Sequence, residues 1–263
     1  MSRLARTFER LQNGGRGGLV TYLTAGDPDA DRSVALLVAV ARAGADVLEV
    51  GVPFSDPLAD GPVIQRASER ALAGGMSLRG VLEVVRRVRA EVDTPIVLFT
   101  YANPVVRMDA AVFARTAADA GVDGVLVLDY PVEEAEPLRA PLRDAGLDPI
   151  FLVSPTTSEE RIRKSAALGA GFLYVISRLG VTGVRDKLPE DVGGLMARVR
   201  ACADLPVALG FGIAHPDQVA EACRVADAAV VGSALVNVVA EHAASSNECE
   251  HASEYVRWLK NSL

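Results

Sequence analysis

The chain has 263 residues, with 27 Lys and Arg against 34 Asp and Glu, which gives a formal net charge of −7. This acidic balance argues against a nucleic-acid-binding protein, which would need a basic stripe. The three Cys residues show no CxxC spacing and the three His residues no metal-ligand spacing, so a disulfide framework and a thiolate metal cage are excluded. Any proton chemistry is therefore expected to fall to carboxylates.

The first predicted element is an N-terminal helix that ends at the glycine-rich segment Asn13–Gly18. The N-terminal sequence lacks the apolar core of a signal peptide, and no later apolar stretch reaches the roughly 18 residues of a membrane span. We therefore expect a cytoplasmic protein with no membrane partner. The glycine-rich segment also lacks the GxxxxGK[ST] pattern of a phosphate-binding P-loop.

Eight short runs rich in Val, Ile and Leu follow along the chain. Near-continuous apolar runs are typical of parallel strands that are covered on both faces. The predicted strands are Leu19–Thr24, Asp46–Gly51, Ile96–Tyr101, Gly124–Asp129, Pro149–Val153, Phe172–Ile176, Pro206–Gly210 and Ala228–Gly232. Helical patterns separate them, including Asp31–Ala43, Val81–Glu91, Ala110–Ala120 and Pro216–Arg224. Left-handed glycine caps are predicted at Gly44, Gly121, Gly146 and Gly169.

Eight such units in a chain of this length predict a (β/α)8 TIM barrel, an α/β fold, as a single domain over residues 1–263. The prediction includes an extra N-terminal helix and extra short helices after strands two and eight. A doubly wound open sheet is the alternative, but its first strand would be followed by GxGxxG, whereas this chain has AGDPD there.

Two connections are longer than a barrel unit needs, and both follow the carboxyl ends of strands. One runs from Val52 to Glu91 and contains two helical stretches split at Gly74 and Gly75; the other runs from Ser177 to Asp191. Long loops at this face of a barrel usually form binding loops or lids.

Two carboxylates near the second strand are the candidate acid and base. Glu49 lies inside the apolar run VLEVG, where a charge would be costly unless it faces the barrel interior. Asp60 lies in the proline-stiffened loop DPLADGP after the same strand. Different surroundings could separate their pKa values. The alternatives are a structural buried acid for Glu49 and ordinary turn chemistry for Asp60 and Asp56.

Glycine-rich turns after strands seven and eight predict a phosphate site. Gly210-Phe211-Gly212 follows strand seven, and Gly232-Ser233 opens a helix after strand eight. Barrels often hold phosphate between these loops, through backbone N–H groups and a helix N-terminus. Glycine-rich turns without a ligand are the alternative.

Aromatic residues on the strands are candidate pocket residues. Tyr22, Phe99 and Tyr101 would line an apolar pocket if they face inward. Tyr174 is central in the sixth strand, and an inward-facing hydroxyl there could form a hydrogen bond with a carboxylate or the substrate. Ordinary core packing is the alternative for each.

Several long motifs together resemble the tryptophan synthase alpha subunit family. They are LEVGVPFSDPLADGPVIQ (Leu48–Gln65), YANPV (Tyr101–Val105), SRLGVTG (Ser177–Gly183), GFGI (Gly210–Ile213) and VVGSALV (Val230–Val236). The resemblance implies retro-aldol cleavage of indole-3-glycerol phosphate to indole and glyceraldehyde 3-phosphate in tryptophan biosynthesis, with no cofactor and no metal in this subunit.

The resemblance also implies site residues. Glu49 would be the general acid/base, and Asp60 would accept the indole N–H. Substrate contacts would come from Tyr174, Thr182, Tyr22, Phe99 and Leu126, and phosphate contacts from Gly183, Gly210, Phe211, Gly212, Gly232 and Ser233. Tyr22 departs from the Phe more usual there and adds a hydroxyl group. The loop Ser177–Asp191 resembles a closing lid.

The implied partner is the pyridoxal-phosphate-dependent beta subunit, in an αββα tetramer. The loop around Pro53–Asp56 and the YANP turn resemble its docking surface. Three alternatives stay open: another phosphate-binding barrel enzyme such as phosphoribosylanthranilate isomerase, a stand-alone indole-releasing lyase, and a non-catalytic activator of the beta subunit.

Overall fold

Eight parallel strands close into one barrel, with each strand paired to the next in chain order and β8 paired to β1. The structure is a computed structural model that describes residues 1–177, 192–210 and 212–263. The strands are β1 (Gly18–Thr24), β2 (Val47–Gly51), β3 (Ile96–Thr100), β4 (Gly124–Val127), β5 (Asp148–Val153), β6 (Leu173–Ile176), β7 (Val207–Gly210) and β8 (Ala228–Val231). Each agrees with a predicted run to within two residues at either end.

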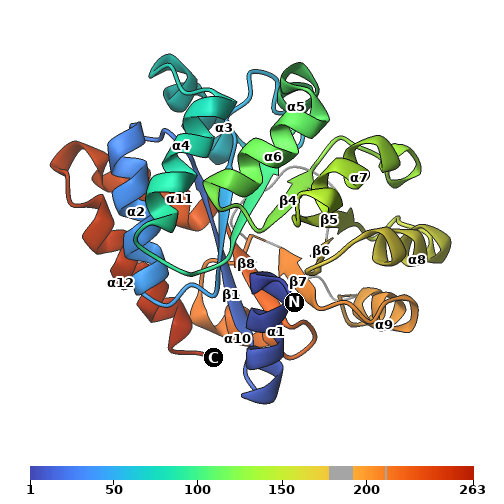
Figure 1. Cartoon of the computed structure of the whole chain (residues 1–263). Helices are drawn as coiled ribbons and strands as arrows, with labels where there is room; N and C mark the ends of the chain where they lie inside the picture. Colours follow the sequence, from blue (N-terminus) through green and yellow to red (C-terminus); the bar gives the residue numbers. More distant parts are fainter. Residues whose placement is uncertain (178–191, 211) are drawn as a thin grey trace.

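Helices surround the barrel, as Figure 1 shows. They are α1 (Arg3–Asn13), α2 (Ala30–Arg42), α3 (Pro62–Ala73), α4 (Leu78–Arg89), α5 (Ala102–Met108), α6 (Ala110–Ala120), α7 (Glu136–Asp144), α8 (Glu159–Leu168), α9 (Val192–Cys202), α10 (Pro216–Cys223), α11 (Ser233–His242) and α12 (Glu248–Lys260). Short 3-10 turns precede α7 (Val132–Glu134) and α12 (Ala243–Ser245). The predicted TIM barrel is confirmed.

The extra helices lie mostly where they were predicted. Helix α1 precedes the first strand, α3 and α4 both follow β2, and α12 is added after α11. Helix α5, after β3, was not predicted. It has seven residues and carries Pro104 in its first turn, a position that a helix tolerates because its N–H has no intrahelical partner there.

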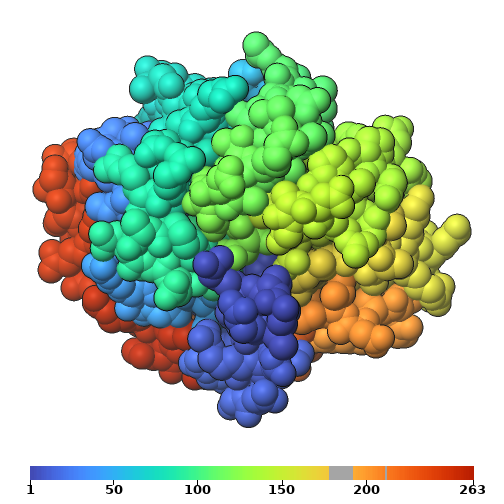
Figure 2. Space-filling view, viewed as in Figure 1, coloured from blue at the N-terminus to red at the C-terminus, as the bar shows by residue number. Residues whose placement is uncertain are grey.

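Helix α1 covers the amino-terminal end of the barrel. Its residues Leu4, Phe8 and Leu11 are buried, and the ring of Phe8 lies 5.4 Å from that of Phe172, one residue before β6. Figure 2 shows the N-terminal segment in dark blue at the lower centre of the visible face. The opposite end of the barrel, where the strands finish, is left for the long loops.

Three of the four predicted glycine caps have a positive φ. Gly44, Gly121 and Gly146 adopt it, with Gly121 in the left-handed cap of α6. The prediction for Gly169 is wrong, because this residue is extended at φ −83° and ψ 169°. A Cβ atom at Gly169 would lie 2.7 Å from the carbonyl oxygen of Ser165, so close approach, not handedness, explains the glycine.

Across the described ranges, no helix is both long and apolar enough to cross a membrane.

Candidate active site

Glu49 lies at the centre of β2 and inside the barrel. Its side chain is 1% exposed, and it interacts electrostatically with Tyr22 on β1 and Tyr174 on β6. Strands β1, β2 and β6 share a common space only in the barrel interior. Among the described residues, neither carboxylate oxygen of Glu49 has a hydrogen-bond partner. An unpartnered buried carboxyl group is stable only if it keeps its proton.

Asp60 lies in the loop between β2 and α3, where hydrogen bonds fix it from two sides. The hydroxyl of Tyr101 donates to its Oδ2 at 3.0 Å, and Nε2 of Gln65 donates to its backbone carbonyl at 2.9 Å. The Tyr101 oxygen also accepts from the backbone N–H of Ala59 at 3.1 Å. Although it is on a loop, Asp60 is only 4% exposed.

The two carboxyl groups differ in acidity because their surroundings differ. Burial, together with the nearby charge of Asp60, raises the pKa of Glu49 to about 8. Burial also raises the pKa of Asp60, to about 6, and the hydrogen bond from Tyr101 opposes this rise. At neutral pH, one group therefore holds a proton while the other is mostly ionised.

Three aromatic rings lie close together inside the barrel. The rings of Tyr22 and Phe99 meet edge to face at 5.2 Å, and those of Phe99 and Tyr174 lie 6.3 Å apart. Leu126 is fully buried and pairs with Phe99 in the β3–β4 register, so both side chains face the same side of the sheet. These four predicted pocket residues thus form one apolar wall beside the carboxyl groups.

The hydroxyl of Tyr22 is satisfied within its own strand. It lies 3.2 Å from Oγ1 of Thr24, in a hydrogen bond that either oxygen could donate. Its ring passes so close to Gly51 that a Cβ atom at that position would overlap the hydroxyl group. The absence of a side chain at Gly51 therefore allows this tyrosine to pack here, a role that the sequence did not predict.

The glycine-rich turns after β7 and β8 lie next to each other, because these two strands pair directly. Gly212 has a φ of 60°, Gly232 precedes α11, and Ser233 is the first residue of that helix. Gly210 is the last residue of β7, where a Cβ atom would lie 2.9 Å from the hydroxyl oxygen of Tyr174. The fold thus gathers Gly212, Gly232 and Ser233, while Gly210 accommodates Tyr174.

Three further predicted contacts, Thr182, Gly183 and Phe211, lie outside the described residues. So does the predicted lid beyond Ser177. The turn interpretation of Asp56 agrees with the structure, since its exposed carboxylate accepts a hydrogen bond from the hydroxyl of Ser55 at 2.6 Å.

The sequence predicted Tyr101 as a pocket residue and as part of the docking turn, but not its hydrogen bond to Asp60. The available signal was its place at the carboxyl end of the predicted third strand, which the structure ends one residue earlier, at Thr100. The ring of Phe54 stacks on Tyr101 at 4.9 Å and helps to fix it. In the part of the chain that the structure describes, no three His, Cys, Asp or Glu side chains gather as a metal site would require.

Comparisons with known proteins match this chain to one family along nearly its whole length. A sequence model described as "Tryptophan synthase alpha chain" matches residues 8–262. The chain is 48% identical to the tryptophan synthase alpha chain of Burkholderia thailandensis over 264 aligned positions, covering 100% of this chain and 97% of that protein. It is 51% identical to that of Thioalkalivibrio sulfidiphilus over 243 positions, covering 92% and 91%.

Solved structures give the same result. The alpha subunit of Legionella pneumophila superposes with a TM-score of 0.91 at 38% identity, covering 100% of this chain and 98% of that one. A chain of Mycobacterium tuberculosis tryptophan synthase superposes with a TM-score of 0.92 at 37% identity, covering 99% and 98%. Because the family model matches almost the full length of this chain, the chain belongs to the tryptophan synthase alpha chain family.

Proposed function

We propose that Glu49 and Asp60 carry the lyase reaction of this family in this chain. The reaction cleaves indole-3-glycerol phosphate into indole and glyceraldehyde 3-phosphate, a step of tryptophan biosynthesis. The observation that carries the proposal is the pair of buried carboxyl groups whose pKa values burial raises to about 8 and about 6. Such a separation gives one acid and one base at neutral pH.

Glu49 acts first as an acid and then as a base. Its proton goes to C3 of the indole ring, which turns the ring into an indolenine that can leave with an electron pair. The Glu49 carboxylate then takes the proton of the adjacent glycerol hydroxyl as the bond between C3 and that carbon breaks. The hydroxyl carbon becomes the aldehyde, and Glu49 ends protonated, as it began. Proton transfer of this kind typically increases the reaction rate by about 10²–10⁴-fold.

Asp60 accepts the indole N–H and stabilises the positive charge that develops on the ring. The group must be ionised for this role, and the hydrogen bond from Tyr101 favours its ionised form. Because that hydroxyl also accepts from the backbone of Ala59, the loop holds the carboxylate in place before substrate arrives.

The remaining site residues bind the two ends of the substrate. The indole ring lies against the apolar wall of Tyr22, Phe99, Leu126 and Tyr174. The phosphate group lies at the turns after β7 and β8, where Gly212, Gly232 and Ser233 offer backbone N–H groups and a hydroxyl group. Gly183, Gly210 and Phe211 complete the phosphate contacts, and Thr182 contacts Asp60 when the lid closes.

This chemistry needs no metal and no organic cofactor in the subunit itself. A carboxylic acid suffices to protonate carbon, and backbone N–H groups at a helix N-terminus suffice to hold a phosphate. We assign pyridoxal phosphate only to the beta partner, and we place the enzyme in the cytoplasm as a single barrel domain over residues 1–263.

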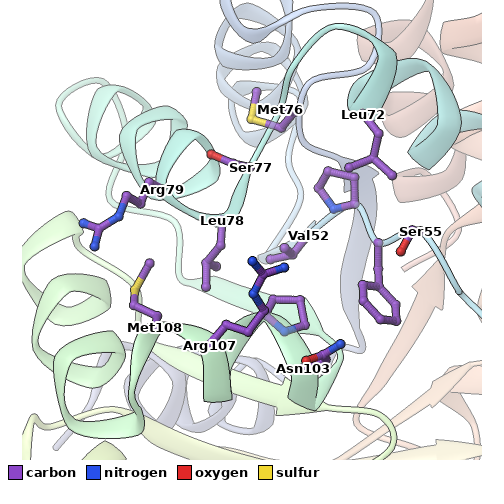
Figure 3. Close-up of a pocket in the computed structure, with 13 residues that line it drawn as sticks. Val52, Ser55, Leu72, Met76, Ser77, Leu78, Arg79, Asn103, Arg107 and Met108 are labelled. Atoms are coloured by element: carbon purple, nitrogen blue, oxygen red, sulfur yellow. The ribbon is translucent and has the colours of Figure 1, made fainter.

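The partner proposed for this chain is the tryptophan synthase beta subunit, in an αββα tetramer. Support comes from a groove of about 490 Å³ that joins the two segments with predicted docking roles. Figure 3 shows the groove, which is lined by three segments of the chain. Val52 and Ser55 follow β2, Leu78 and Arg79 begin α4, and Asn103, Arg107 and Met108 belong to α5. Leu58, on the same loop as Ser55, is 88% exposed, as a partner contact would be in the free chain.

An indole-release assay tests the proposal. Purified chain is incubated with indole-3-glycerol phosphate, with and without a beta subunit, and both products are measured. We expect equal amounts of indole and glyceraldehyde 3-phosphate, and faster release when the beta subunit is present. Release that is fast and indifferent to the beta subunit would indicate a stand-alone lyase. An absence of turnover in both arms would indicate a non-catalytic activator.

A further inference from the structure

The turn after β7 is held from two sides by side chains that do not belong to the predicted site. Oε1 of Gln218, on α10, accepts the backbone N–H groups of Ala214 at 2.8 Å and of His215 at 3.1 Å. From the other side, the hydroxyl of Tyr255 donates to the carbonyl of Ala214 at 2.7 Å. The peptide groups on both sides of Ala214 are thereby fixed two residues from Gly212.

Tyr255 reaches this turn from α12, at the far C-terminal end of the chain. It is 41 positions from Ala214 in sequence, so only the fold brings the two together. Its ring lies 5.7 Å from that of Trp258, and Trp258 in turn meets the ring of His215 edge to face at 5.3 Å. Two consecutive residues of the turn, Ala214 and His215, therefore contact side chains of α12.

The same helix also packs against the helix that follows the second predicted phosphate turn. Helix α12 packs against α11, whose first residue is Ser233. The salt bridge between Arg32 and Glu248, at 2.5 Å, ties the start of α12 to α2. The C-terminal helix is thus fixed to the barrel, and it contacts both the turn after β7 and the helix that begins at Ser233.

We propose that Tyr255 is a positioning residue for phosphate binding, acting through the backbone of Ala214. The proposal rests on the phosphate site proposed above. Tyr255 does not touch the substrate; its hydroxyl holds the Gly212–His215 turn in the conformation that offers N–H groups to the phosphate. A turn that is already ordered loses less conformational entropy when the ligand binds. Burial raises the pKa of Tyr255, so the phenol keeps its proton and remains a donor.

Calorimetric titration of Tyr255→Phe with two probes tests the idea. Glycerol phosphate carries the phosphate without the ring, and indole carries the ring without the phosphate. We expect the Kd for glycerol phosphate to rise about two- to tenfold, as the loss of one hydrogen bond would give. The Kd for indole should stay unchanged. In the cleavage reaction, KM should rise by a similar factor while kcat is retained.

Two further variants sharpen this test. Gln218→Met removes the acceptor on the other side of the turn and should give the same pattern. Tyr130→Phe makes the same chemical change at a half-buried tyrosine between β4 and α7 and should leave both Kd values unchanged. A merely structural effect of Tyr255 would instead weaken both probes together, and that result would overturn the proposal.

Ser233→Asp separates a failure of this proposal from a failure of the phosphate site itself. The added charge should repel glycerol phosphate and weaken its binding strongly. If Ser233→Asp leaves that Kd unchanged, the phosphate site is misassigned and the role of Tyr255 falls with it. If Ser233→Asp weakens binding but Tyr255→Phe does not, the site stands and the positioning role is wrong.

Discussion

At the scale of single residues, a hydrogen bond contributes to the difference between the pKa values of the two carboxyl groups. Both are removed from water, which favours their protonated forms. Glu49 has no described partner to offset this effect, whereas Asp60 accepts the hydroxyl of Tyr101. The sequence could single out Glu49, because a lone carboxylate in an apolar strand is too costly to bury against the surrounding helices and must face the barrel interior. It could not reveal the Tyr101 contact, which depends on the path of the loop from Val52 to Gly61.

The first prediction is a bell-shaped pH profile for kcat/KM. Activity should fall below about pH 6 as Asp60 takes up a proton, and above about pH 8 as Glu49 loses its proton. Steady-state cleavage assays between pH 5 and 9.5 measure both limbs. A profile without a fall on the alkaline side would contradict a protonated Glu49 as the acid.

A second prediction concerns Tyr101→Phe. Removing a hydrogen bond that lowers the pKa of Asp60 should raise that pKa, so the acidic limb should move to higher pH. A bond of typical strength corresponds to about half to one pH unit. The alkaline limb serves as the internal control and should stay in place. Equal movement of both limbs would mean that the variant disturbs the site generally.

At the scale of elements, the two ends of the barrel have different tasks. The carboxyl ends of the strands lead into Asp60 and the phosphate turns, and the amino ends carry ionic contacts. Asp123 is 6% exposed and accepts hydrogen bonds from Arg3 at 3.0 Å, Arg89 at 2.6 Å and the backbone of Ile96 at 2.8 Å. It thereby joins α1, α4 and β3.

Asp123→Asn should therefore reduce stability without reducing catalysis. The change leaves the Arg89 charge, which is largely buried, without its partner, and such losses cost roughly 3–5 kcal/mol of unfolding free energy. Residues at this face of a barrel serve stability, so kcat/KM of the folded enzyme should stay within about twofold. Urea denaturation followed by cleavage assays measures both quantities. A large loss of kcat/KM in folded protein would contradict this division between the two ends.

The strands were easier to predict than the helices that decorate them. A strand buried on both faces must be apolar along its length, so every strand left a clear pattern. Helix α5 is short and partly exposed and left none. The role of Gly169 was misread because a sequence cannot separate a glycine needed for its φ from one needed for a close approach.

At the scale of the whole molecule, the buried acid at the centre affects folding as well as catalysis. In the unfolded chain Glu49 ionises near its usual pKa of 4.5, whereas in the folded chain its pKa is raised to about 8. A raised carboxyl pKa favours the folded state fully below about pH 4.5, and this contribution is lost as pH rises toward 8. The buried, protonated Glu49 therefore lowers the free energy of unfolding at neutral pH.

Glu49→Gln should reverse that loss. The amide cannot ionise, so the variant should be more stable than the wild type at pH 8, by roughly 2–4 kcal/mol. The difference should shrink as pH falls toward 5. Denaturant unfolding at the two pH values measures it. A variant that is less stable than the wild type at pH 8 would show that Glu49 is ionised and satisfied in the folded chain.

The family and its reaction could be predicted from the sequence because long motifs cover the chain. The assembly with a beta subunit is harder to predict, because a docking surface is formed by segments that are separate in sequence. The end of β2 and helix α5 border one groove only after the barrel has closed.

The most direct test of the account is single-turnover cleavage of indole-3-glycerol phosphate by the Glu49→Gln variant, with substrate binding measured in parallel. We predict that indole formation is lost, by a factor of at least about 10², while the Kd for the substrate changes by less than about threefold. Loss of catalysis with binding retained would match a proton donor that acts in the transition state. A variant that still releases indole at the wild-type rate would contradict the role of Glu49 and the mechanism built on it.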